Sequence, residues 1–174
     1  YSHRARVLTE LVPKVCALAR AAKLWNIGFT VDAEEADRLD LSLDVIEAVF
    51  RHPELRGWDG FGLAVQAYQP RALFVIGWVD ALARNVDQKI MVRLVKGAYW
   101  DAEIKHSQIE GFDGYPVFTR KYSTDVSYQA CARKLLSCRA QLFPQFATHN
   151  AYTVATILEL DREFGEWQGG GFEF

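Results

Sequence analysis

The chain has 174 residues, of which 50% are apolar and 24% are charged, and its formal net charge is -2 at pH 7. This composition is that of an ordinary globular protein, and the length suits one domain spanning residues 1–174. Basic and acidic residues are interspersed, so no nucleic-acid contact is expected, and no apolar run approaches the ~20 residues of a membrane-spanning helix. Cys16, Cys131 and Cys138 have no metal-binding spacing, which predicts reduced thiols, a cytoplasmic location and no metal site.

Apolar runs typical of buried strands alternate with amphipathic helical patterns along the chain. The predicted strands cover residues 27–31, 61–65, 89–95 and 142–147, and residues 172–174, after Gly169-Gly170-Gly171, begin a fifth. The predicted helices are residues 15–25, with Pro13 near the start; a segment with Leu39, Leu43, Ile46 and Phe50 that ends at His52-Pro53; a segment from Pro70 with Leu73, Ile76, Val79 and Leu82; a segment opened by Asp125; and a segment with Val154, Ile157, Leu158 and Leu160. The first helix is expected to turn Val15, Leu18, Ala19 and Ala22 inward. Between Gly97 and Asp125 the pattern assigns no regular element.

A strand followed by a helix recurs roughly every 30 residues, which indicates an α/β protein with a parallel sheet. Two architectures have this order, an open doubly wound sheet and a (β/α)8 barrel. The GxGxxG dinucleotide signature is absent after the first strand, and every predicted strand ends in a polar or charged residue, as at the mouth of a barrel. Because such a barrel needs ~250 residues, we expect an incomplete TIM-type (β/α)8 barrel of about four units plus the start of a fifth strand.

Polar residues stand at the predicted strand ends, which meet at one end of a barrel axis. They are Asp32, Gln66, Arg93 with Lys96, and Thr148-His149-Asn150. Each also has a structural interpretation, because Asp32 and Asn150 can cap the helices that follow, and Gln66 and His149 can be hydrogen-bonded structural groups. Their convergence from four strands favours a functional site.

The segment from Met91 to Asp101 carries the most specific chemistry. Strand periodicity places Arg93 on the same face as Met91 and Val95, where a permanently charged guanidinium requires a partner. Either it pairs with an acid such as Asp32, or it faces an electron-rich cofactor. Gly97 would allow close approach of a ligand to the backbone, and the aromatic rings at positions 99 and 100 would supply flat apolar surface.

Five segments together resemble the proline dehydrogenase domain of bacterial bifunctional proline utilization A. They are FTVDAEEADR (29–38), VQAYQ (65–69), MVRLVKGAYWD (91–101), YPVFTRKYSTDVSY (115–128) and PQFATHN (144–150). The resemblance implies an FAD-dependent barrel that oxidises L-proline to Δ1-pyrroline-5-carboxylate, the first step from proline to glutamate, and passes electrons to a membrane quinone. It also implies that the parent protein associates peripherally with the inner membrane and can carry a glutamate semialdehyde dehydrogenase domain.

The resemblance implies a role for each matching position. Arg93, Asp32 and Tyr99 would be catalytic, with Arg93 near flavin N5 and Tyr99 beside the substrate. The residues that would contact FAD are Asp32, Gln66, Arg93, Val95, Lys96, Gly97, Trp100, Thr148, His149 and Asn150.

Parts of the family pattern are missing from the chain, including a first strand with a lysine and the paired arginines that hold the proline carboxylate. We therefore expect the chain alone to be inactive and its unpaired strand edges to be destabilising. Two alternatives stay open: a barrel enzyme that uses Lys96 as a Schiff-base lysine, and a non-catalytic barrel fragment that acts as a scaffold. A zinc hydrolase is weaker, because only His149 of the four histidines follows a strand.

Overall fold

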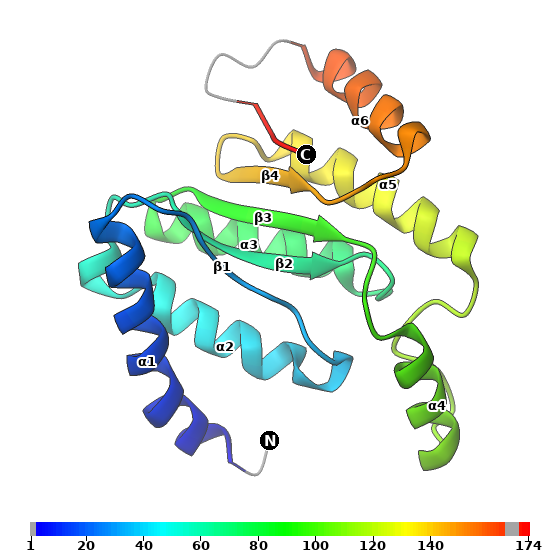
Figure 1. Ribbon diagram of the computed structural model, residues 1–174, viewed down its shortest axis with the longest axis horizontal. Helices are drawn as coiled ribbons and strands as arrows, with labels where there is room; N and C mark the ends of the chain where they lie inside the picture. Colours follow the sequence, from blue (N-terminus) through cyan, green and yellow to red (C-terminus); the bar gives the residue numbers. More distant parts are fainter. Residues whose placement is uncertain (1–2, 166–170) are drawn as a thin grey trace.

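Strands and helices alternate along the chain, as the apolar pattern predicts. The structure is a computed structural model that describes residues 3–165 and 171–174 (Figure 1). Its elements are α1 (Arg4–Leu24), β1 (Phe29–Val31), the 3₁₀ helix η1 (Ala36–Arg38), α2 (Leu39–Phe50), the 3₁₀ helix η2 (Pro53–Leu55), β2 (Phe61–Gln66), α3 (Ala72–Val86), β3 (Ile90–Val95), α4 (Trp100–Glu110), α5 (Lys121–Ser137), β4 (Leu142–Phe146) and α6 (Ala151–Phe164).

The strands form one parallel sheet in the order β1-β2-β3-β4. In the register of this sheet, Arg93 lies between Ala64 on β2 and Gln145 on β4. Because all the strands run the same way, their carboxyl ends lie along one edge, and the loops that follow them are neighbours. The α/β class and the parallel sheet are therefore confirmed.

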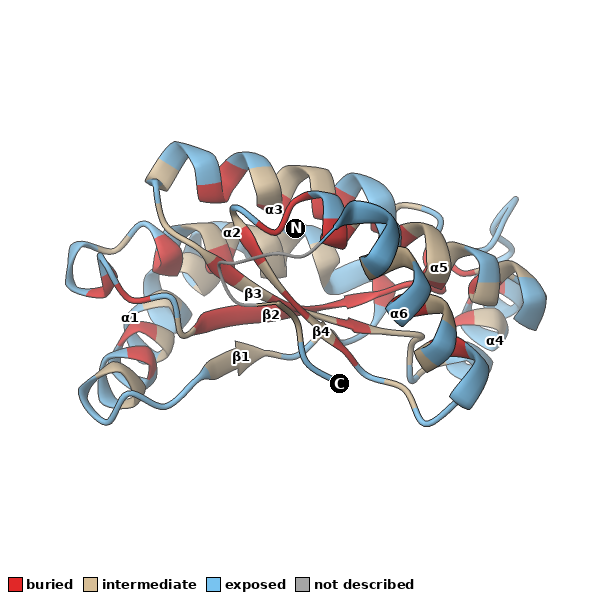
Figure 2. Ribbon diagram, turned by 90° about the horizontal axis from the view of Figure 1, so that it is seen from above, coloured by how far each residue is buried: buried red, intermediate tan, exposed pale blue. Residues whose placement is uncertain are grey.

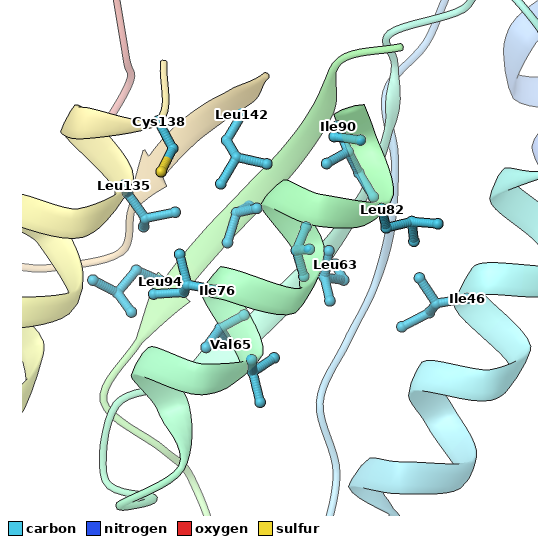
Figure 3. Close-up of a cluster of buried hydrophobic side chains, with 14 of the residues drawn as sticks. Ile46, Leu63, Val65, Ile76, Leu82, Ile90, Leu94, Leu135, Cys138 and Leu142 are labelled. Atoms are coloured by element: carbon cyan, nitrogen blue, oxygen red, sulfur yellow. The ribbon is translucent and has the colours of Figure 1, made fainter. Parts of the chain in front are cut away.

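One face of the sheet is covered by helices. Along β3 the residues alternate, with Ile90, Val92 and Leu94 fully buried and the residues between them half-buried. Figure 2 shows α2 and α3 on the same side of the strands, and Figure 3 shows Ile46, Ile76, Leu82 and Leu135 from the helices directed at the strand residues. Each such side chain contributes roughly 1.5–3 kcal/mol by leaving water, so this layer holds the sheet in place. The opposite face carries Met91, Arg93 and Val95.

The last described residues lie alongside β4. The Phe146 N–H donates to the Glu173 carbonyl at 2.8 Å, and the Glu173 N–H donates to the Pro144 carbonyl at 3.1 Å. Gln145 and Glu173 thereby form a parallel bridge, as expected for the start of a fifth strand. Of the three glycines predicted to precede it, Gly169 and Gly170 lie outside the described residues.

The first helix is longer than the sequence predicts, because it begins at Arg4 and contains Pro13 in its interior. Val7, Leu8 and Val12 pack against the core and extend the apolar stripe toward the N-terminus. Leu18, predicted to face inward, is 59% exposed. Leu73 and Leu158 are also exposed rather than buried, so the inward faces of α3 and α6 are narrower than predicted.

Helix α4 lies in the stretch where the sequence pattern predicts no regular element. Its buried residues are Glu103 and Ser107, so it carries no apolar stripe that a sequence pattern could reveal. Helix α5 begins at Lys121, one turn before the predicted start at Asp125. Strand β1 is limited to Phe29–Val31, because Ile27 is 60% exposed and belongs to the preceding loop.

All three cysteines are buried and free, as expected of small apolar residues in the core. Within residues 3–165 and 171–174, no helix has both the length and the apolar character needed to cross a membrane.

Candidate functional site

A hollow of about 900 Å³ lies at the carboxyl edge of the sheet. Its lining comes from the loops after β1, β3 and β4, from Phe174, and from the strand residues Ala64, Gln66 and Val95. The predicted site residues in its lining are Asp32, Gln66, Val95, Lys96, Gly97, Tyr99, Thr148, His149 and Asn150; the others are Ala33, Glu34, Ala64, Ala98, Ala147 and Phe174. The predicted site residues that share this hollow lie up to 118 positions apart in the chain, from Asp32 to Asn150 (150 − 32 = 118).

Arg93 reaches this site through an ion pair. Its Nη1 donates to Asp32 Oδ1 at 3.2 Å, and Asp32 lines the hollow. The ion pair considered from the sequence is therefore formed. Asp32 does not cap the next helix, because η1 follows Glu35 and α2 begins only at Leu39, so that interpretation is wrong.

Gln66 is 4% exposed and ends β2 at the floor of the hollow. Its Nε2 donates to the Ala33 carbonyl at 3.4 Å, and its Oε1 accepts a hydrogen bond from Gln69 Nε2 at 2.8 Å. Arg71 Nε donates to Gln69 Oε1 at 2.9 Å and continues the chain of contacts away from the hollow. Gln69 and Arg71 lie three and five positions after the end of β2, and the strand-end pattern of the sequence did not mark them as site residues.

Lys96 is held by an ion pair with Asp125 on α5, and Lys121 Nζ lies 3.4 Å from the other carboxylate oxygen. The hydrogen bond from Lys96 is the largest cause that lowers the pKa of Asp125 below its ordinary value. The sequence indicated Asp125 only as a helix start, whereas the structure shows it as the anchor of a cation at the site.

Tyr99 joins two loops at the mouth of the hollow. Its hydroxyl donates to Glu34 Oε2 at 2.6 Å, across the loops that follow β1 and β3. This hydrogen bond to the carboxylate is the main reason that the pKa of Tyr99 is raised. Glu34 lies in the FTVDAEEADR motif, but nothing in the sequence distinguished it from its acidic neighbours.

The loop after β4 leads directly into α6. Asn150 Oδ1 accepts from the Thr153 N–H at 3.1 Å, so Asn150 caps the helix, as one interpretation of the sequence predicted. Thr148 Oγ1 in turn accepts from the Asn150 N–H at 3.1 Å, and His149 is exposed between them. The positive end of a fourteen-residue helix therefore faces the same edge of the sheet.

A second hollow of about 390 Å³ adjoins the first and shares Lys96 and Gly97 with it. The remaining residues of its lining are Tyr68, Trp100, Thr119, Lys121 and Thr124. Trp100 lies here rather than in the larger hollow, with its Nε1 donating to the Phe118 carbonyl at 2.8 Å. Gly97 has a φ of 135°, and a Cβ at this position would collide with the Tyr68 ring.

Metal ligation has no support in this geometry, since the described part of the chain contains no group of three or more His, Cys, Asp or Glu residues that could hold an ion. The donors around the hollows are instead amides, cations and a helix N-terminus.

Comparison with known proteins agrees with this arrangement. Residues 2–174 match the family model described as proline dehydrogenase. The bifunctional protein PutA of Klebsiella aerogenes is 52% identical over 169 residues, which are 97% of this chain and 13% of that protein. The bifunctional protein PutA of Rhizobium meliloti is 51% identical over 175 residues, or 100% of this chain and 14% of the relative.

Solved structures give the same result. A variant of proline utilization A (PutA) from Bradyrhizobium japonicum superimposes with a TM-score of 0.93 at 64% identity, over 99% of this chain and 17% of that one. Proline utilization A from Bdellovibrio bacteriovorus, inactivated by N-propargylglycine, has a TM-score of 0.91 at 27% identity, over 95% of this chain and 17% of that one. The chain thus spans a small part of the length of these relatives, and the resemblance seen in its motifs is confirmed. This chain belongs to the proline dehydrogenase family.

Proposed function

We propose that the complete protein oxidises L-proline to Δ1-pyrroline-5-carboxylate with FAD as the hydride acceptor, and that this chain forms the central part of its (β/α)8 barrel. The observation that carries the proposal is the single hollow in which Asp32, Gln66, Lys96 and Thr148 meet from four different strand ends. Ligands bind at this edge in barrels of parallel strands. The strand order β1-β2-β3-β4, with helices on one face, supports the barrel.

The residues present fit FAD. The two adjoining hollows, of about 900 and 390 Å³, lie in the size range of cofactor sites and meet at Lys96 and Gly97. An elongated, anionic dinucleotide suits two connected hollows with a cation at their junction. The N-terminus of α6 adds backbone donors and the positive end of its dipole. Val95 and Trp100 add apolar surface, and the aromatic ring suits a flat heterocycle.

FAD, when bound, supplies the redox chemistry of the reaction. The residues of this chain bind and orient its parts. Asp32 holds the guanidinium of Arg93 in place, and this cation would stabilise negative charge on a flavin bound at the site. Tyr99, held by Glu34 in the lining of the larger hollow, would lie beside the substrate. None of these residues is proposed as a general base.

The activity is proposed for the complete protein, because the chain spans only 13% of the length of a bifunctional relative. We propose that this chain is inactive by itself, and that the parent protein works in the cytoplasm and at the inner membrane, where a quinone takes up the electrons. The bifunctional relatives make a second, glutamate semialdehyde dehydrogenase activity part of the same proposal.

The alternative use of Lys96 as a Schiff-base residue is disfavoured by its ion pair with Asp125, because the carboxylate holds the lysine nitrogen that would have to attack a carbonyl carbon. Borohydride trapping of a carbonyl substrate on Lys96 tests this alternative, which we expect to fail.

The proposal is tested by the visible spectrum of the complete protein under anaerobic conditions. We expect a flavin band near ~450 nm that bleaches with L-proline and stays unchanged with D-proline. A colourless protein would favour the non-catalytic scaffold instead, and a flavin that L-proline does not reduce would remove proline oxidation while leaving the cofactor.

A further inference from the structure

A chain of hydrogen bonds runs from Arg71, at the N-terminus of α3, to Gln66 at the floor of the larger hollow. Arg71 Nε donates to Gln69 Oε1 at 2.9 Å, and Gln69 Nε2 donates to Gln66 Oε1 at 2.8 Å. Gln66 and Gln69 are 4% and 3% exposed, so these two amides are shielded from water. Buried amides of this kind keep the orientation that their partners impose.

The direction of this chain is set by the chemistry of arginine. A guanidinium has only donors, so Gln69 must present its carbonyl oxygen to Arg71. The amide nitrogen of Gln69 is then directed at Gln66, which accepts the hydrogen bond with its side-chain oxygen. The Gln66 nitrogen is left with one N–H directed at the Ala33 carbonyl, at 3.4 Å, and one for a ligand in the hollow that Gln66 lines.

Arg71 is itself firmly placed. Its Nη1 donates to Asp40 at 3.2 Å, and its Nη2 donates to the Ala36 carbonyl. The Ala36 N–H donates to Glu103 Oε1 at 2.6 Å, so both polar groups of this backbone unit are held. The loop that carries Ala33, the other partner of Gln66, is therefore tied to the same guanidinium.

We infer that Arg71 and Gln69 are positioning residues that fix Gln66 as a hydrogen-bond donor toward the ligand in the hollow, which selects an electron-rich acceptor such as a ring carbonyl. This inference rests on the proposed function, because the acceptor considered is the flavin ring of FAD. A donor at this point stabilises the reduced ring more than the oxidised ring, since the reduced ring carries more negative charge. A carbonyl oxygen at this point would do the opposite.

Replacing Gln69 with glutamate reverses the chain of hydrogen bonds without removing it. A carboxylate accepts from Arg71 and also demands a donor from Gln66, which must turn its nitrogen away from Ala33 and the hollow. In the complete protein, we expect Gln69→Glu to weaken FAD binding about tenfold and to make the flavin midpoint potential more negative. Gln69→Leu only removes one contact and leaves Ala33 to orient Gln66, so its FAD affinity is expected to fall about threefold or less.

The order of these two variants separates orientation from packing. A purely structural role of Gln69 predicts that the glutamate, which has the same size and keeps its contact with Arg71, is the milder change. Titrating the flavin-free complete protein with FAD, followed by spectral redox titration, measures both quantities. The inference is overturned if Gln69→Leu is equal to or worse than Gln69→Glu. Glu47→Gln is the control, because it removes the partner of Arg51 in an ion pair on α2 and touches neither Arg71 nor the two amides; its FAD affinity should stay within twofold of wild type.

A second pair of variants keeps the inference testable if Gln69→Glu does not fold. Arg71→Lys retains a group with donors only and should bind FAD within threefold of wild type, whereas Arg71→Met should lose about tenfold. Equal affinities for the two Arg71 variants would overturn the inference. A wild-type protein without a proline-reducible flavin would instead remove the proposed function, so the two failures are distinguishable.

Discussion

Arg93 on β3 and Asp32 after β1 form an ion pair, with 3.2 Å between Nη1 and Oδ1, although 61 positions separate them in the chain. The two side chains are 39% and 72% exposed, so water screens their attraction and the pair contributes less than about 1 kcal/mol to stability. Its importance lies in placing a positive charge beside the hollow.

Arg93→Ala should therefore slow the reaction far more than it destabilises the fold. We expect anaerobic flavin reduction by L-proline to be at least 100-fold slower, the order of loss seen when a charge-stabilising donor is removed. Stopped-flow absorbance near ~450 nm measures this rate. Arg84→Ala, which breaks an exposed pair with Asp80 within α3, is the control and should react at the wild-type rate. A loss below threefold at Arg93 would refute its electrostatic role.

Gly97 and Gly77 provide opposite responses to the same substitution. Gly97→Ala forces a Cβ against the Tyr68 ring at a φ of 135°, so the free energy of unfolding should fall by roughly 2–4 kcal/mol. Gly77 lies inside α3 with nothing within 4 Å of an added Cβ, so Gly77→Ala should raise it by about 0.5–1 kcal/mol. Urea unfolding of the complete protein measures both, and a tolerated Gly97→Ala would contradict the close approach to Tyr68.

Tyr68 and Tyr128 are both buried, but their hydroxyl groups differ. The Tyr128 hydroxyl lies 3.3 Å from the Ala147 carbonyl and 3.4 Å from that of Leu94, whereas Tyr68 Oη makes no hydrogen bond of ordinary geometry with the described residues. Tyr128→Phe should cost about 0.5–1.5 kcal/mol of unfolding free energy, and Tyr68→Phe should be neutral or stabilising. Thermal unfolding without added ligand compares them, and a larger loss at Tyr68 would show that its hydroxyl has a partner.

Tyr68 also predicts a loss of stability at alkaline pH. Burial is the main cause that raises its pKa from 10.0 to about 12, while the backbone of Tyr99 acts in the opposite direction. Because the pKa is raised in the folded state, the contribution of neutral Tyr68 to the free energy of unfolding is complete below pH 10.0. It is lost as the pH rises toward about 12. The Tyr68→Phe variant should unfold at a higher pH than wild type in an alkaline titration followed by circular dichroism; an unchanged midpoint would argue against this burial.

Asp125 predicts the corresponding effect in acid. Its pKa lies below the ordinary value of 3.8, chiefly because Lys96 donates a hydrogen bond to it. Because the pKa is lowered in the folded state, the contribution of ionised Asp125 to the free energy of unfolding is present above pH 3.8. It is lost as the pH falls through the pKa that Asp125 has in the folded protein. Because the carboxylate is 35% exposed, Asp125→Asn should cost below about 1 kcal/mol at neutral pH and flatten the acid limb of the unfolding curve. Glu159→Gln, from an exposed pair on α6, should leave that limb unchanged.

Apolar periodicity in the sequence predicts the elements that bury apolar residues, but it does not predict helix α4, whose buried residues are polar. Strand β3 and helix α2 have clear periodicities, and their predicted positions are confirmed. Helix α4 buries Glu103, which accepts a hydrogen bond from the distant Ala36 N–H, and Ser107, which donates to the Glu103 carbonyl within the helix. The sequence of α4 therefore has no apolar periodicity from which the helix could be predicted.

The sequence by itself determined which residues stand at the strand ends, because a buried parallel strand must end where polar residues begin, and it carried the motifs of the proline dehydrogenase family. Only the tertiary structure decided the partners of these residues. The pairs Lys96–Asp125 and Tyr99–Glu34 join positions 29 and 65 apart, through contacts that depend on how helices and loops pack. The direction of the Gln66 amide likewise follows from Arg71, because the orientation of a buried amide is set by its neighbours in space and not by its place in the chain.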